Sequence, residues 1–494
     1  MGIIINQSFK NMVTTYFGFG IGAVNTLFLF TYFLEKEYYG LISFLLSAAN
    51  LIWPLMAFGV HNTLVKFYSS YKTRETRDKF LTLILVLPLM VSLLLGLLGF
   101  FSYSLLLDYF SGGNELVQPY VWLIFVIAVA TAYFEVFFAW SKVNYHSVFG
   151  NFMKEVFHRI CITVLLFLVF LEVLSVEYFV YAMAGVFLLR AGAMQIYAFS
   201  LYKPKFNFSL PYNIASILKY SALILIAGSV AMILLDLDKV MIEHYLPIGE
   251  VAVYGIAVYI ATVISVPQKA MHQITHPLTA NLLNEKDREG LDDLYKRSSL
   301  SLLVVSALIF ILIIVNLNML YELIPEEYQM STMIVLLISL VKLYDNMLGN
   351  NNSILFNSDY YRLVLVVGVF LAILAFVFNL IFIPLLGIFG AALATFLAFS
   401  IYNTSKIFLV FQKFKMHPFS RKTLIILLFT AVLTAGFYYW EFPFHPIINI
   451  ILKSALVSIV YMGAALRFGF SSDVTGLVSG MYSKVTSSHK SGNP

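Results

Sequence analysis

Apolar residues along this chain form long continuous runs that are separated by short polar segments. A helix needs about 20 residues to cross the roughly 30 Å of hydrocarbon in a bilayer. Runs of that kind lie at 11–33, 40–64, 80–103, 119–139, 153–171, 178–200, 216–238, 251–271, 299–321, 330–349, 361–383, 387–411, 421–440 and 446–466. They lack the alternation of barrel strands, and helices are the remaining way to satisfy the backbone in lipid. The pattern predicts an all-α polytopic membrane protein with about fourteen transmembrane helices.

Basic residues sort onto alternate sides of the predicted spans. With the N-terminus inside, the inside segments hold Lys66, Lys72, Arg74, Arg77, Lys79, Lys142, Lys154, Lys203, Lys205, Lys219, Lys286, Arg288, Lys296, Arg297, Lys406, Lys413, Lys415, Arg421, Lys422, Arg467, Lys484 and Lys490. The outside segments hold only Lys36 and Lys239 and are otherwise acidic. Because excess Lys and Arg marks cytoplasmic loops, the charges predict an even number of spans with both termini in the cytoplasm. The first run is too long for a cleaved signal peptide, so we expect it to remain as the first helix.

The composition excludes several classes of protein. Only 12% of residues are charged and 60% are hydrophobic, whereas about a quarter of the residues in soluble domains are charged. Cys161 is the single cysteine, which excludes a disulfide framework and a thiolate metal site. The net charge of +5 is distributed by membrane side and does not indicate nucleic-acid binding. The sequence contains no Walker A, HExxH or G-x-S-x-G motif, so we expect no enzymatic centre and no cofactor.

The polar segments divide the spans into two halves and a remainder. The predicted divisions are an N-lobe of six helices at 1–200, a cytoplasmic linker at 201–215, a C-lobe of six helices at 216–411, two further helices at 412–470 and a disordered tail at 471–494. The linker is polar, basic and contains proline. Six spans per lobe give both lobes the same orientation, as in parallel repeats. An acid followed by Tyr39-Gly40 in one lobe and by Tyr254-Gly255 in the other supports the repeat.

Ionisable residues within the spans are the candidates for function, because each costs a few kcal/mol unless it faces a partner or a cavity. Arg190 lies near the middle of the sixth run. It either lines a water-filled cavity or pairs with Glu135 or Glu155. Arg159 snorkels to the inner surface, pairs with Glu155 one turn earlier, or lines the same cavity. Glu135 is either a titrating group for ion coupling or the counter-ion of an arginine.

The second half carries a similar set. Lys342 and Asp345 are three residues apart on one helix face, which fits either an internal ion pair or a transport site. Lys269 follows Pro267 at the inner end of the eighth run, where snorkelling is favoured over a cavity contact. Lys453, in the last run, is also expected to snorkel.

Asp236, Asp238 and Lys239 end the seventh run at the outer side. A solvated mouth is favoured there over a deep site, with Lys239 as a cavity candidate and Asp238 as an ion-coupling candidate. The intramembrane charges as a set are more basic than acidic. Arginine and lysine in a cavity attract anions such as phosphate or pyrophosphate, whereas an exporter of cationic drugs would more naturally show buried carboxylates.

Three stretches resemble the polysaccharide (Wzx-type, O-antigen/exopolysaccharide) flippase family of the multidrug/oligosaccharidyl-lipid/polysaccharide exporter superfamily. The first is Lys10-Asn11, Tyr16, Gly18, Phe33-Leu34-Glu35-Lys36-Glu37-Tyr38-Tyr39-Gly40-Leu41, Gly59 and Lys66-Phe67-Tyr68. The second is Leu237-Asp238-Lys239-Val240-Met241-Ile242 with Glu250 and Tyr254-Gly255-Ile256-Ala257. The third is Asn379 with Ile383-Pro384-Leu385-Leu386-Gly387-Ile388-Phe389-Gly390-Ala391-Ala392-Leu393-Ala394-Thr395. The resemblance covers roughly residues 8 to 410.

The resemblance implies two six-helix lobes around a central cavity, with two C-terminal helices packed outside. It implies transport of an undecaprenyl-pyrophosphate-linked oligosaccharide across the bacterial cytoplasmic membrane by alternating access, for O-antigen, capsule or exopolysaccharide synthesis. An ion or proton gradient would drive transport. Partners would be the lipid-linked oligosaccharide, membrane lipids and other polysaccharide assembly proteins, with no nucleic acid. A lipid II flippase, a cation-coupled multidrug exporter of the same superfamily and a membrane glycan-modifying enzyme are the alternatives.

Overall fold

The computed structural model describes residues 2–105, 107 and 114–476, and in this part of the chain it contains helices and no strands. Side chains of residues 2–6, 8, 9, 226–235, 273 and 361 are not described. The all-α class is therefore confirmed. Contacts group the chain into two compact units. Unit 1 holds the residues up to Ile256 together with Ala375–Ala391, and unit 2 holds Ala257–Leu374 and the residues from Ala392 onward. The two six-helix lobes stay a prediction.

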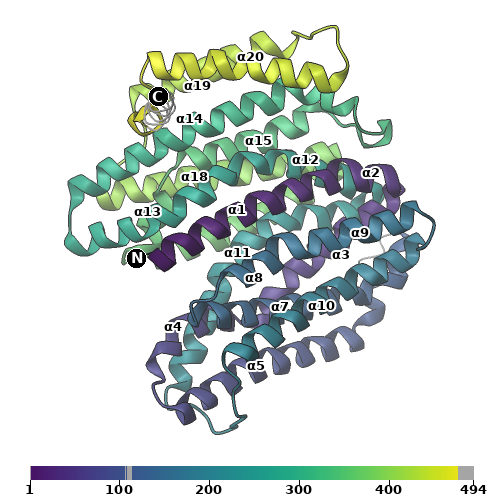
Figure 1. Ribbon diagram of the computed structural model, residues 1–494, viewed down its shortest axis with the longest axis vertical. Coiled ribbons are helices and arrows are strands. Elements are labelled where there is room, and N and C mark those ends of the chain that lie inside the picture. The colour runs from purple at the N-terminus through teal and green to yellow at the C-terminus, as the bar shows by residue number, and fades with distance from the viewer. Residues whose placement is uncertain (1, 106, 108–113, 477–494) are drawn as a thin grey trace, which may run out of the picture. The chain divides into compact units, whose positions relative to one another are not determined.

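Unit 1 is organised around α3. Its elements are α1 (Gly2–Val24), the π-helical turn η1 (Asn25–Leu29), α2 (Phe30–Phe33), α3 (Lys36–Ala57), α4 (Val60–Phe67), η2 (Tyr68–Ser70), α5 (Arg74–Phe101), η3 (Glu115–Tyr120), α7 (Val121–Val143), α8 (Val148–Phe152), the π-helical turn η4 (Met153–Phe157), α9 (His158–Phe170), α10 (Val176–Leu201), α11 (Ile214–Tyr245) and the first part of α12 (Gly249–Thr262). Helix α3 packs against α5, α7 and α11, and α10 packs along α7 (Figure 1).

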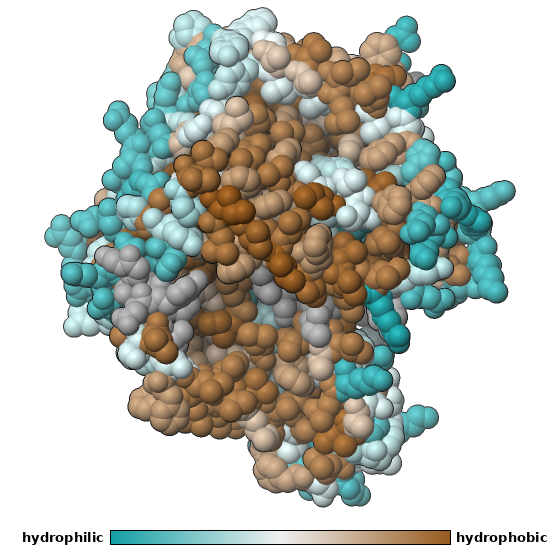
Figure 2. All heavy atoms as spheres, turned by 180° about the vertical axis from the view of Figure 1, so that it is seen from behind, coloured by the Kyte–Doolittle hydropathy of each residue, from teal (hydrophilic) through white to brown (hydrophobic). Residues whose placement is uncertain are grey.

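Unit 2 is organised around α14. Its elements are η5 (Val263–Ser265), α13 (Val266–Glu285), α14 (Arg288–Tyr321), η6 (Glu326–Tyr328), α15 (Thr332–Met347), α16 (Asn351–Asn357), most of α17 (Tyr361–Leu386) and α18 (Ile388–Phe414), α19 (Arg421–Tyr438) and α20 (Pro446–Arg467). Helix α14 packs against α13, α15, α19 and α20. Apolar side chains cover much of the molecular face drawn in Figure 2, as lipid contact requires.

Eleven helices in the described residues are long and apolar enough to span a membrane, and the bent pair α15–α16 makes a twelfth if it is counted as one span. The predicted count of fourteen is not confirmed. Two of the predicted runs, 153–171 and 216–238, are not among these helices, each for a local reason. The run 153–171 carries three charged residues, Lys154, Glu155 and Arg159, near its beginning. The run 216–238 lies in α11, in which the described side chains form the shorter apolar stretch Ile214–Leu225.

Polar side chains set the beginnings of several helices. The Thr73 hydroxyl accepts a hydrogen bond from Thr76 N and begins α5. Ser175 does the same for Tyr178 N at the start of α10, and Asp287 accepts from Gly290 N at 2.9 Å at the start of α14. The first turn of a helix leaves N–H groups without intrahelical acceptors, and these side chains supply them.

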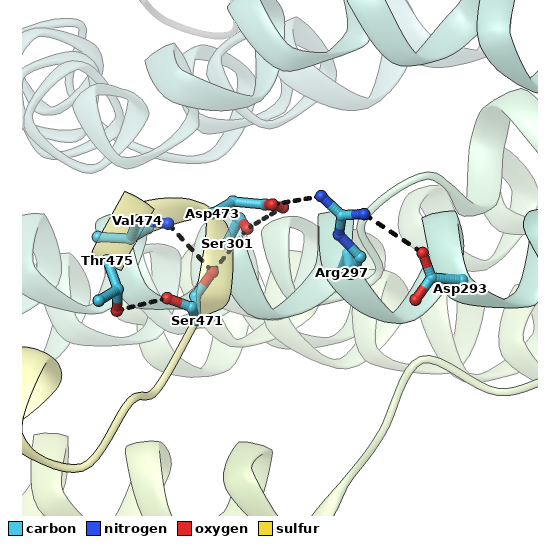
Figure 3. Close-up of polar contacts among 7 residues, drawn as sticks. All are labelled: Asp293, Arg297, Ser301, Ser471, Asp473, Val474 and Thr475. Carbon is cyan, nitrogen blue, oxygen red and sulfur yellow. Dashed lines mark hydrogen bonds and ion pairs between the residues drawn. The ribbon is translucent and has the colours of Figure 1, made fainter. Parts of the chain in front are cut away.

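The beginning of the predicted disordered tail is ordered in the structure. Residues 472–476 are helical, and the hydroxyl of Ser471 lies 2.9 Å from that of Ser301 in α14. Asp473 accepts from Arg297 at 2.5 Å, and Arg297 also lies 3.4 Å from Asp293 (Figure 3). The tail prediction is therefore wrong for residues 471–476, because these polar groups find partners on α14. Residues 477–494 lie outside the described part of the chain.

Lys453 does not snorkel. It is 1% exposed, and its amine donates a hydrogen bond of 2.6 Å to the carbonyl of Val315 in α14. The adjacent Ser454 hydroxyl accepts from Asn316 at 3.0 Å, and Tyr461 OH donates to Val304 O at 3.0 Å. The snorkelling prediction is wrong because α20 presents these polar groups to α14, where backbone and amide partners satisfy them.

The bend between α15 and α16 depends on Gly349. The two helices meet at 57°, and Gly349 has a φ of +56°. A Cβ atom at this position would lie 2.5 Å from Ser299 N. Only glycine adopts that conformation readily and permits the close approach of α14.

We predict that Gly349→Ala lowers the stability of the protein by about 1–2 kcal/mol or more, because a left-handed conformation disfavours a Cβ atom and this Cβ also meets the backbone. The midpoint of thermal unfolding, measured on purified protein in detergent, should fall. Gly436→Ala in α19 is the control, because a Cβ there meets no atom within 4 Å. Equal midpoints for the two variants would show that the bend does not depend on Gly349.

Candidate functional site

The second and third sequence motifs meet at Asp238 in unit 1. Asp238, in α11, is 3% exposed. Its carboxylate accepts a hydrogen bond of 2.5 Å from Tyr254 OH in α12 and one of 2.7 Å from Asn379 Nδ2 in α17. The expectation of a solvated mouth is wrong at Asp238, because these helices cover the carboxylate. A buried carboxylate held by neutral donors from two other helices is a natural place for a charge that titrates or binds a cation.

The first motif contacts the second on the neighbouring helices. Lys36, at the start of α3, donates to Glu250 Oε1 in α12 at 2.8 Å. One turn later, a Cβ atom at Gly40 would overlap the carbonyl oxygen of Ile248. The helices can approach this closely only because residue 40 is glycine. The repeated acid-Tyr-Gly pattern thus marks a contact between the two stretches that carry it.

A second acid of α11 fixes the predicted cavity residue Lys239. Asp236 lies 3.5 Å from Lys239 Nζ. It also accepts from Ser47 Oγ at 2.8 Å and from Asn50 Nδ2 at 3.2 Å, both in α3. Lys239 is therefore half of an ion pair whose acid is held by α3. This arrangement stabilises the α3–α11 contact and leaves Asp238 as the more buried acid.

Arg190 is buried without a carboxylate partner. It is 6% exposed, and its guanidinium lies 4.3 Å from the ring centroid of Phe134 and 4.8 Å from that of Phe187. Its Nε has no hydrogen-bond acceptor, and Arg190 forms no hydrogen bond or ion pair with any residue in the described part of the chain. Stacking on aromatic rings offsets part of the cost of burial, but the guanidinium donors remain available for an anion.

The two carboxylates expected as partners of Arg190 are occupied by other cations. Glu135 accepts from Lys154 at 2.6 Å, and Glu155 lies 3.2 Å from Arg159. Arg159 also donates to the carbonyl of Glu155, while its own carbonyl accepts from Asn25 at 3.0 Å. The Glu155–Arg159 pair predicted one turn apart is present. Glu135 is a counter-ion, but for Lys154, a residue that the sequence placed only in an inside loop.

In unit 2, Asp345 pairs with Lys406 of α18. The Lys406 amine lies 3.3 Å from Asp345 Oδ1 and 3.2 Å from Asn352 Oδ1, and Lys406 is 1% exposed. Gln268 Nε2 in α13 donates to the other carboxylate oxygen at 3.1 Å. Sequence reasoning missed Lys406 as a site residue, although its place inside the apolar run 387–411 was a signal for burial.

Lys342 and Lys269 are the remaining candidates of unit 2. Lys342 lies 5.8 Å from the ring centroid of Phe399. Lys269 is exposed on α13. Among the described residues, no group of three or more His, Cys, Asp and Glu side chains could hold a metal ion. The candidate site residues are therefore charged groups: a buried arginine in α10, a buried carboxylate in α11 and a half-buried carboxylate in α15.

Known structures share this fold. The lipid II flippase MurJ, in an inward closed conformation, superposes with a TM-score of 0.71 at 16% identity over 92% of this chain and 98% of that one. A mutant of the Vibrio cholerae MATE transporter VcmN gives 0.56 at 14% identity over 84% and 98%. The MATE multidrug transporter DinF-BH, in a complex, gives 0.54 at 13% identity over 83% and 95%. These similarities establish the fold, which is that of flippases and multidrug transporters.

The sequence comparison is more specific. No curated protein sequence matches the chain. The family model described as polysaccharide biosynthesis protein matches residues 5–282, more than half of the chain. The match includes α1 to α12 with the first two motifs, Arg190 and Asp238. The chain belongs to the polysaccharide biosynthesis protein family, as the resemblance of its motifs predicts.

Proposed function

We propose that the protein moves an undecaprenyl-pyrophosphate-linked oligosaccharide from the inner to the outer leaflet of the bacterial cytoplasmic membrane, for synthesis of an O-antigen, capsule or exopolysaccharide. The observation that carries this proposal is Arg190, a buried guanidinium whose Nε has no acceptor among the described residues, in a chain of the polysaccharide biosynthesis family. A pyrophosphate would supply the missing acceptors, since guanidinium groups bind phosphate oxygens in a bidentate manner.

A gradient-driven mechanism by alternating access accompanies this proposal. Transport would be driven by protons or a cation acting on the buried Asp238. Asp238 is suited to this role because two of its partners, Tyr254 and Asn379, are neutral donors that can be retained when the carboxylate gains a proton or a cation. Asp345 and Glu135 each accept from a lysine, Lys406 and Lys154.

Two other functions fit the fold. MurJ is named as a lipid II flippase, and VcmN and DinF-BH are MATE transporters. A lipid II flippase would share the pyrophosphate chemistry and differ in the glycan. A multidrug exporter would carry cations, which a buried unneutralised arginine repels. The charge of Arg190 therefore favours an anionic lipid-linked substrate over a cationic drug.

Arg190 provides the first test. We predict that Arg190→Met lowers surface glycan export by about ten- to a hundred-fold, because a hydrogen bond to a charged group contributes about 1.5–3 kcal/mol. Methionine has an unbranched, flexible side chain and removes a buried charge, so thermal stability should be kept or raised. Export is measured by complementation of a strain that lacks the gene, at matched protein level.

Arg190→Lys is the matched control and should retain part of the export, because it keeps the charge but loses the bidentate geometry. Normal glycan display in the methionine variant would refute the anion-binding role. Loss of both export and thermal stability in the methionine variant would instead show a structural role for the arginine.

Asp238 provides the second test. We predict that Asp238→Asn abolishes the dependence of transport on an imposed proton or sodium gradient, because asparagine keeps the shape and can still accept from Tyr254 but does not ionise. Transport of a purified lipid-linked oligosaccharide is followed in proteoliposomes with and without each gradient. Gradient-driven transport should fall about ten-fold or more, the effect of a coupling free energy above about 1.4 kcal/mol.

Asp293→Asn is the control for charge removal. Asp293 lies on the surface of α14 with 64% of its side chain exposed, and surface ion pairs contribute little. Its gradient dependence should equal that of the natural protein. If the Asp238 variant responds to both gradients as strongly as the control, energy coupling lies elsewhere.

A further inference from the structure

The linker at 201–215 carries an exposed apolar face that the sequence reading missed. From Lys203 to Tyr212 the chain reads Lys-Pro-Lys-Phe-Asn-Phe-Ser-Leu-Pro-Tyr. Phe206, Phe208 and Leu210 occupy every second position, the spacing that places side chains on one side of an extended chain. Residues 202–211 are not helical, and the three side chains are 63%, 75% and 66% exposed. The description of the linker as simply polar and basic is therefore incomplete.

Hydrogen bonds hold the linker against the inner end of α5. Tyr202 OH donates to Asp78 Oδ1 at 2.7 Å, and the backbone N–H of Asn207 donates to Thr82 Oγ1 at 3.0 Å. Burial, together with the bond to Asp78, raises the pKa of Tyr202 to about 12, so the phenol keeps its proton at physiological pH. At the far end of the linker, Tyr71 donates to the Asn213 side chain.

The sequence of α5 places these bonds at the edge of the hydrocarbon. Helix α5 has 28 residues, about 42 Å at 1.5 Å per residue, whereas about 20 residues cross the hydrocarbon. All of its charged residues lie in Arg74–Lys79, and none occurs from Phe80 to Phe101. The hydrocarbon therefore begins near Phe80. Asp78 and Thr82 lie on either side of that boundary, so the backbone of Asn207 is held at the level where headgroups meet acyl chains.

We infer that the linker is a membrane-surface anchor, with Phe206, Phe208 and Leu210 inserted among the lipids of the cytoplasmic leaflet and Lys203 and Lys205 against anionic headgroups. Phe and Leu form the inserted face of interfacial segments whose polar face carries lysine, and both lysines here are exposed. Lysine side chains close to the surface are attracted to anionic headgroups. In the topology predicted from the loop charges, this side of the membrane faces the cytoplasm, where anionic lipids and basic loops meet.

A lipid surface explains the exposed residues better than a protein partner. A strand-adding partner would use the free N–H and C=O groups of the linker, but Asn207 N is already engaged with Thr82, and prolines at 204 and 211 remove two more donors. The apolar residues also lie where headgroups meet acyl chains, a level at which lipid is present without any partner. The anchor would restrain the inner ends of α10 and α11, which the linker joins, against movement along the membrane normal.

The test uses a single fluorescent reporter. Cys161 is the only cysteine, so a Cys161→Ala background accepts one new cysteine at Phe208→Cys, labelled with an environment-sensitive fluorophore. The neighbouring Ser209→Cys is the matched control, because it is exposed and lies one residue out of the apolar register. Both are placed in nanodiscs of phosphatidylethanolamine and phosphatidylglycerol, and quenching is measured with headgroup-proximal spin-labelled lipid and with aqueous iodide.

We expect spin-labelled lipid to quench the reporter at 208 several-fold more than the reporter at 209, and iodide to show the opposite order. Equal lipid quenching at the two positions, or free access of iodide to 208, would overturn the proposal and leave the face open for a protein partner. A second variant excludes insertion driven by the label itself. Adding Phe206→Ser and Leu210→Ser should release the reporter at 208 to iodide, and unchanged lipid quenching there would also count against the anchor.

The lysines are tested with the same reporter. Lys203→Gln with Lys205→Gln, or nanodiscs of phosphatidylcholine alone, should weaken the lipid quenching at 208 in both cases. Identical quenching in anionic and neutral lipid would refute the electrostatic part of the proposal. None of these measurements involves glycan transport, so their outcome is independent of the proposed substrate.

Discussion

A polar group inside a bilayer must find its partner within the protein, because the hydrocarbon offers neither donors nor acceptors. This constraint accounts for the interior contacts of both units. Asp238 is held by Tyr254 and Asn379, and Lys406 is held by Asp345. Even Lys453, which has no carboxylate within ion-pair distance among the described residues, donates to a backbone carbonyl of α14. Each of these contacts joins different helices, so satisfying the polar groups also fixes how the helices pack.

The same constraint explains which features the sequence reveals. Long apolar runs predict membrane spans, because the length and the hydropathy of a segment can be read from that segment alone. The predicted count differs from the structure where a span bends, as at Gly349 between α15 and α16. Such breaks are made by backbone geometry and by contacts with other helices, and they leave the hydropathy of the run unchanged.

The candidate charges were found from the sequence, but their partners were not. Asp238 and Asn379 are separated by 141 residues, and Asp345 and Lys406 by 61. Both members of the first pair belong to family motifs, so the motifs identified the residues without indicating that they meet. Pairing by proximity in sequence succeeded only for Arg159 and Glu155, one helical turn apart.

Arg190 and Lys453 are both buried cations, and their surroundings differ in the respect that bears on function. The Lys453 amine has a carbonyl at 2.6 Å and neighbours that join α20 to α14, so its environment is that of a structural contact. Arg190 has aromatic rings on which to stack but no acceptor for its Nε among the described residues. A guanidinium presents five donors, and rings satisfy none of them fully. A buried charge in this condition raises the free energy of the folded protein unless an anion or water supplies acceptors. A transporter that releases its cargo needs a site of this kind. Donors that the protein already satisfies would gain little by binding a phosphate, because they would first have to give up their own hydrogen bonds.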